Sequence, residues 1–69
     1  MASLQDRLLS AHARDDRAAL VALYTEAADT APDIDAACFY LTHAYIFALE
    51  KGDPATNALY DRLKAHGRV

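Results

Sequence analysis

The sequence predicts an all-α protein in which four antiparallel helices form two helix-turn-helix units. Apolar residues recur every three or four positions, which is the spacing of amphipathic helices. The chain contains only two Gly and two Pro, and these fall between the periodic stretches. No stretch alternates apolar and polar residues as a half-buried strand would. The predicted connections are short, so neighbouring helices should run antiparallel.

The first predicted helix covers residues 3–13 and the second covers residues 17–29. Ser3, with Asp6 three residues later, resembles a capping box in which Asp replaces Glu. Asp16 is a good N-cap for the second helix, which must end before Pro32 because a residue preceding proline avoids helical dihedrals. The apolar stripes of the two helices consist of Leu4, Leu8 and Ala11, and of Leu20, Leu23, Tyr24 and Ala27.

The third predicted helix, residues 34–51, is the longest, with Asp33 as its N-cap and Gly52 at its end. One apolar stripe consists of Ile34, Cys38, Leu41, Tyr45 and Leu49. A second apolar set on nearly the opposite side consists of Phe39, Ile46 and Phe47. A third strip, of Ala37, Ala44 and Ala48, is small enough to admit another helix closely. A helix that is apolar almost all round must be covered on more than one side.

The fourth predicted helix covers residues 54–66. Asp53 can cap it, and Pro54 is tolerated in the first turn because its missing N–H is not needed there. Ala55, Leu59 and Leu63 should face the core. Gly67 is expected to close the helix.

Length and composition restrict the class of protein. Sixty-nine residues make one domain, residues 1–69, with helix pairs 3–29 and 34–66. The net charge is −3 and the basic residues are scattered, which argues against nucleic acid and against an anionic membrane surface as partners. No apolar run suits a signal peptide or a membrane span, so we expect a cytoplasmic protein. The frequent Ala, Arg and Asp are typical of a GC-rich bacterial genome.

An internal repeat suggests how the helices pack. Residues 22–24, Ala-Leu-Tyr, recur as residues 58–60 at equivalent places in the second and fourth helices. The chain therefore reads as two helix pairs of about 34 residues each.

The two units resemble the tetratricopeptide (TPR) repeat. The matching positions are Tyr24, Ala27 and Pro32 in the first unit, and Leu41, Ala44, Tyr45 and the turn Gly52-Asp53 in the second. Cys38 and Thr42 depart from the repeat, where an aromatic and a small residue are usual, and Leu20 replaces a small residue. A four-helix bundle, completed by dimerisation, is the alternative packing.

The resemblance implies a function as well as a fold. TPR arrays bind peptides on the face made by the first helix of each pair, which suggests a small protein-interaction module or accessory subunit with a protein or peptide partner. The partner-binding residues would be Gln5, Leu9, His12, Phe39, His43, Ile46, Phe47 and Glu50. Phe39 and Phe47 would be the anchors, because aromatic residues dominate many interfaces. The alternatives are a homodimeric structural or regulatory protein that uses the same face for self-association, and burial of that face within the chain.

No pattern of residues indicates catalysis, a metal or a cofactor. Within a predicted helix, His12, His43 and His66 form no i, i+4 pair with another His, Cys or carboxylate in the manner of an H-E-x-x-H motif. Cys38, the only cysteine, is expected to be a small buried hydrophobic residue. His43 and Glu50 share one face, where they read as the polar rim of an interface. We therefore expect neither an enzyme nor a cofactor-binding protein.

Overall fold

The computed structural model describes residues 3–69, which form four helices and no strand. The helices are α1 (Leu4–Ala13), α2 (Arg17–Asp29), α3 (Ile34–Lys51) and α4 (Thr56–Ala65). The predicted all-α class with four helices is confirmed.

Local chemistry sets the beginnings of the first three helices and the end of α3. The side chains of Ser3, Asp16 and Asp33 each accept a hydrogen bond from the backbone N–H three residues later, at 3.1, 3.1 and 2.8 Å. These bonds satisfy donors that have no partner within a helix. Gly52 ends α3 in the left-handed conformation, with φ +71°, where a residue with a Cβ would be strained.

The start of α4 differs from the prediction by two residues. Residues 53–55 form a tight turn, and the helix begins at Thr56. The Asp53 carboxylate accepts from the Ala55 N–H at 2.8 Å, and the Asp53 carbonyl accepts from the Thr56 N–H and hydroxyl at 3.1 and 2.7 Å. The turn therefore uses the polar groups that a cap at Asp53 would have used.

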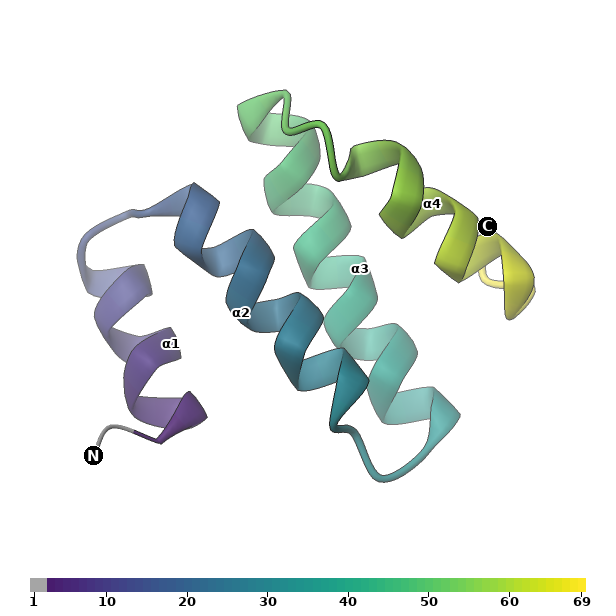
Figure 1. Cartoon of the computed structure of the whole chain (residues 1–69), viewed down its shortest axis with the longest axis horizontal. Coiled ribbons are helices and arrows are strands. Elements are labelled where there is room, and N and C mark those ends of the chain that lie inside the picture. The colour runs from purple at the N-terminus through teal and green to yellow at the C-terminus, as the bar shows by residue number, and fades with distance from the viewer. Residues whose placement is uncertain (1–2) are drawn as a thin grey trace.

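The helices form an open row that is one helix thick. Backbone contacts join each helix only to its neighbours in the chain, α1 with α2, α2 with α3, and α3 with α4 (Figure 1). Side chains add two longer links, His12 of α1 with Phe47 of α3 and Asp29 of α2 with Arg62 of α4. The dimensions of the row, 34 × 28 × 13 Å between Cα atoms, agree with a single layer. Because α1 and α4 lie at opposite ends, α2 and α3 carry the largest interface, and both faces of the row are open.

The core lies along α3, where it meets α2 and α4. Ala44 and Ala48 are completely buried, and their small side chains allow the close approach that the sequence predicts. The main cluster of buried residues consists of Val21, Ala28, Cys38, Leu41, Ala44, Ala48, Leu59 and Leu63. Cys38 is a buried free thiol, as expected. Several of these residues are small, so the core buries a modest apolar area.

The first apolar stripe predicted on α3 is only partly correct. Cys38 and Leu41 are buried, whereas Ile34 is 57% exposed and Leu49 is 53% exposed. Leu49 fails because it points away from the buried side of α3, which is centred on Ala44 and Ala48. Ile34 lies in line with the buried Leu41, two turns later, and is exposed as the first residue of the helix.

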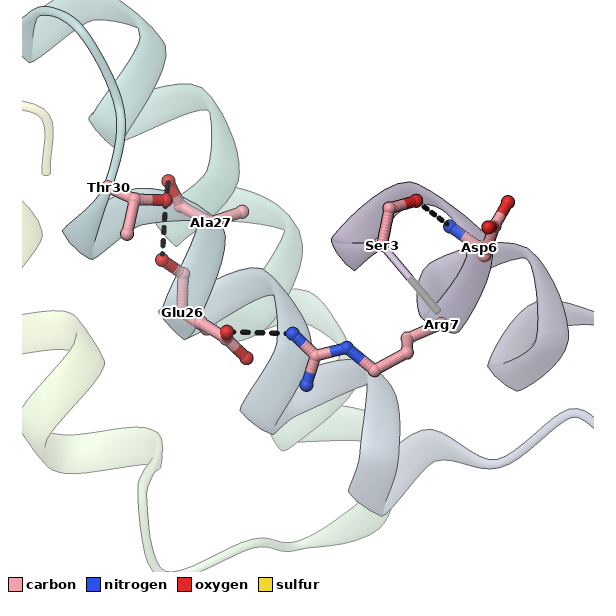
Figure 2. A network of polar contacts seen from close by, with 6 residues as sticks. All are labelled: Ser3, Asp6, Arg7, Glu26, Ala27 and Thr30. Atoms are coloured by element: carbon pink, nitrogen blue, oxygen red, sulfur yellow. Dashed lines mark hydrogen bonds and ion pairs between the residues drawn. The ribbon is translucent and has the colours of Figure 1, made fainter. Parts of the chain in front are cut away.

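An ion pair joins α1 to α2 on the surface. The Arg7 guanidinium donates to the Glu26 carboxylate at 2.7 Å (Figure 2). Nearby, the Ser3 side chain caps α1, and the Thr30 hydroxyl donates to the Glu26 carbonyl at the end of α2. Both charged side chains are nearly half exposed, so water screens the pair and it contributes little stability. Packing of Ala11, which is completely buried, is the firmer attachment of α1.

Candidate functional site

An apolar seam lies along the exposed side of α3. Phe39, Ile46 and Leu49 are 58%, 47% and 53% exposed, and Thr42 is also exposed. We call Phe39, Thr42, Ile46 and Leu49 the α3 seam. Successive members are three, four and three residues apart, which is the spacing by which two helices pack with knobs in holes. These side chains leave an apolar surface of α3 in contact with water.

A cluster of rings lies beside the seam and joins three helices. We call His12, Tyr24, Phe39, Tyr40, His43 and Phe47 the aromatic cluster. Tyr24 of α2 is at its centre, stacked on His43 and Phe47 with ring centroids 5.2 and 5.8 Å away. His12 of α1 contacts Tyr24 and Phe47 edge-on, at 5.8 and 5.9 Å.

Phe39 connects the aromatic cluster to the α3 seam. Its ring lies 4.5 Å from the His43 ring and 5.5 Å from the Tyr40 ring. Tyr40 also contacts Tyr24, at 6.3 Å. The apolar surface of α3 therefore continues from the exposed seam onto rings that α2 and α1 hold in place.

Two hydrogen bonds orient the imidazoles of the cluster. His12 Nε2 lies 2.9 Å from the Tyr24 hydroxyl. His43 Nδ1 lies 2.9 Å from the Phe39 carbonyl. Because a carbonyl only accepts, His43 must donate through Nδ1, so the proton of its neutral form is on this nitrogen. The other nitrogen, Nε2, remains to bond water or a partner.

Packing in the cluster changes the acidity of Tyr24. Burial raises the pKa of the Tyr24 phenol above its ordinary value of 10.0, and the neighbouring Tyr40 adds to the increase. Desolvation acts in this direction because it disfavours the charged phenolate. Tyr24 is therefore neutral at physiological pH, and its hydroxyl is a hydrogen-bond donor and acceptor.

The structure brings together half of the predicted partner-binding residues. His12, Phe39, His43 and Phe47 all belong to the aromatic cluster. The other four lie outside the cluster: Gln5, Leu9, Ile46 and Glu50 are exposed, and Ile46 belongs to the α3 seam.

Two of the predicted roles change in the structure. Phe47 is only partly exposed, because it packs between His12 and Tyr24 and against the core, so part of its contact area is already used within the chain. Glu50 accepts a hydrogen bond from Arg17 of α2 at 2.7 Å, which ties α3 to α2. This bond and a second carboxylate, Asp15, hold the pKa of the Arg17 guanidinium above its usual value.

Sequence reasoning missed three residues of this surface. Tyr24 was assigned to the buried stripe of α2, although it is the centre of the aromatic cluster. Leu49 was assigned to the core stripe of α3. Arg17 was not singled out at all. For Leu49 a signal was available, since its spacing from Phe39, Thr42 and Ile46 continues the seam.

Two hollows lie next to these features. One, of about 380 Å³, lies between α1 and α2 and is lined by Asp6, Arg7, Ser10, Arg14, Ala19, Ala22 and Leu23. The other, of about 360 Å³, is at the start of the α3 seam and is lined by Asp35, Cys38, Phe39, Thr42 and Arg68. Both are open to solvent, so neither encloses a small molecule.

Among residues 3–69, no group of three or more His, Cys, Asp or Glu side chains is arranged to hold a metal ion. None of the described helices is both long enough and apolar enough to cross a membrane. Comparisons of the chain with protein-family models, with curated proteins and with solved structures find no match.

Proposed function

We propose that the protein is a small interaction module, or accessory subunit, that docks another polypeptide chain on the apolar face of α1 and α3. One observation carries this proposal. Phe39, Ile46 and Leu49 of α3 are each about half exposed, on a single face, next to a cluster of aromatic rings. Burying such side chains in an interface contributes about 25 cal/mol per Å² of apolar area.

The aromatic cluster supports this function because it holds its rings in fixed positions. Phe39 contacts two other rings, and His43 is stacked on Tyr24 and bonded to the backbone. Side chains that are already ordered lose less conformational entropy when a partner covers them. The partner gains an apolar platform with two imidazole groups, His12 and His43, for polar contacts.

TPR-like packing is part of the proposal, and the ion pairs support it. Three hydrogen-bonded ion pairs each join residues 33 positions apart: Arg17 with Glu50, Asp29 with Arg62, and Asp35 with Arg68. Two of these pairs, Arg17 with Glu50 and Asp29 with Arg62, join the second helix of the first unit to the second unit, and contacts between adjacent units are what a stack of repeats requires. The bacterial origin and cytoplasmic location that the composition predicts stay predictions.

The alternative is a homodimeric structural or regulatory protein in which the same face binds a second copy. The exposed apolar area of α3 favours both readings, because an isolated chain leaves it in water. A small chain with an alanine-rich core also gains stability from association.

The test uses purified protein, immobilised and exposed to cell extract, alongside the variant Phe39→Glu. We expect wild-type protein to retain partner chains that Phe39→Glu does not, because a carboxylate on the face must be desolvated on docking. Ala22→Glu, an exposed substitution beside the hollow between α1 and α2, is the control and should retain the same chains. The proposal fails if wild type is monomeric and Phe39→Glu captures the same proteins as wild type.

A further inference from the structure

We propose that the α3 seam binds the α3 seam of a second copy of the chain, with the two α3 helices antiparallel around a two-fold axis. This inference rests on the proposed function, since it names the partner of the same apolar face.

The seam is complementary to itself in the antiparallel orientation. A two-fold axis at the level of Ala44 places Phe39 opposite Leu49 of the second copy, and Thr42 opposite Ile46 of the second copy. Each layer then combines a larger and a smaller side chain, so the layers fill space evenly. A parallel pair would instead place Phe39 against Phe39 and leave a layer of two threonine hydroxyls.

The hollow at the start of the seam fits this arrangement. It has a volume of about 360 Å³ and lies beside Phe39 and Thr42. Leu49 of the second copy stands at the level of Phe39 in the antiparallel pair, so its side chain is placed at the Phe39 side of the hollow and occupies part of it. The two-fold axis repeats this contact in the other hollow.

The charges at the ends of the seam do not oppose the pairing. Asp35 at one end is paired with Arg68, and Glu50 at the other end is paired with Arg17. The antiparallel orientation brings the Asp35–Arg68 pair of one copy toward the Glu50–Arg17 pair of the other. Each of these pairs contains one acidic and one basic side chain. Because each acid keeps an arginine of its own chain in either orientation, the charges permit the pairing, and the choice of the antiparallel orientation rests on the spacing of the seam.

The architecture gives a reason for a second copy as the occupant. Domains usually bury their apolar faces between two packed layers, and this chain forms one layer, 13 Å deep between Cα atoms. The seam spans eleven residues of helix, from Phe39 to Leu49, which is about 15 Å at the rise of an α-helix. A second copy supplies a helix of equal length and spacing, and two-fold dimers are the commonest oligomers.

The test is disulfide cross-linking between single-cysteine variants in a Cys38→Ala background. Thr42→Cys and Ile46→Cys proteins are prepared separately, mixed in equal amounts and oxidised mildly. We expect cross-linked dimer from the mixture, with little from either variant alone, because position 42 of one copy faces position 46 of the other. The second pair, Phe39→Cys with Leu49→Cys, tests the same register if one of the first variants does not fold.

The outcomes separate this inference from the proposed function. A mixture of Ala58→Cys with Thr42→Cys is the control, since Ala58 is exposed on α4 and outside the docking face, and it should give no dimer. Disulfides within each single variant would show a parallel pair and overturn the arrangement. Cross-linking in no mixture would overturn the dimer. In that case, loss of partner chains by Phe39→Glu in the capture experiment with cell extract would still support docking of a foreign chain.

Discussion

Tyr24 holds the aromatic cluster together at the scale of single residues. Its ring stacks on two rings of α3, and its hydroxyl lies 2.9 Å from His12 Nε2 of α1. One side chain of the central helix therefore links the helices on both sides. This role could not be predicted from the sequence, because it depends on the angles at which three helices meet.

Replacing Tyr24 with Phe tests the hydrogen bond to His12. We expect Tyr24→Phe to lower the free energy of unfolding by about 0.5–1 kcal/mol, because the ring contacts remain and one partly exposed hydrogen bond is lost. Urea denaturation followed by circular dichroism measures the change. Tyr60→Phe, at an exposed tyrosine of α4, is the control. Equal effects of the two substitutions would mean that the bond to His12 contributes nothing.

The raised pKa of Tyr24 predicts how stability changes in alkali. The folded chain keeps the phenol proton to a higher pH than the unfolded chain, whose tyrosines ionise near 10.0. The unfolded state therefore loses this proton first, and the stabilisation is complete below pH 10.0 and declines as the pH rises through the folded pKa.

This pH dependence can be measured directly. Denaturation of wild type and of Tyr24→Phe across the alkaline range should show a steeper fall for wild type, because the variant lacks the titrating group. Parallel curves would contradict the raised pKa.

At the scale of the elements, the ends of α3 follow from short-range chemistry. Asp33 and Gly52 were both assigned from the sequence, and both act as expected, since a cap or a left-handed terminus depends on a few neighbouring residues. The start of α4 was placed two residues early because Asp53 can either cap a helix or form a turn, and here it forms the turn.

Gly52→Ala tests the termination of α3. The added Cβ meets no atom within 4 Å, so any cost comes from the backbone dihedral and not from a clash. An alanine in the left-handed region costs about 1 kcal/mol, and we expect this loss in the free energy of unfolding. Gly67→Ala, at φ +69° near the end of the chain, is the control and should cost less because α4 can fray there. Equal losses would argue against this view of the two ends.

The faces of α3 were harder to predict than its ends. Periodicity identifies apolar stripes, but it does not say which stripe meets a neighbouring helix when nearly every side is apolar. Ile34 and Leu49 were therefore assigned to the core, whereas the buried side is centred on two alanines. Phe39 and Ile46 were assigned to the partner-binding face and are exposed on it.

At the scale of the whole molecule, the four helices could be predicted, and the shape of their packing could not. Both a TPR-like stack and a four-helix bundle fit the helix lengths and the short connections. The observed open row depends on α1 contacting α2 and not α4, which is a matter of long-range packing. The row leaves the α3 seam uncovered, and this exposure is the basis of both proposals.

The central claim, that the α3 seam docks a second copy, is tested most directly by solution mass. Light scattering across a range of concentrations should give twice the mass of one chain for wild type, falling toward one chain on dilution. Ile46→Glu should give one chain throughout with unchanged helicity, because position 46 is exposed and Glu favours helices. Ala58→Glu, at an exposed alanine of α4 outside the docking face, should remain a dimer. A wild-type protein that is monomeric at every concentration would contradict the claim, as would an Ile46→Glu protein that dimerises like wild type.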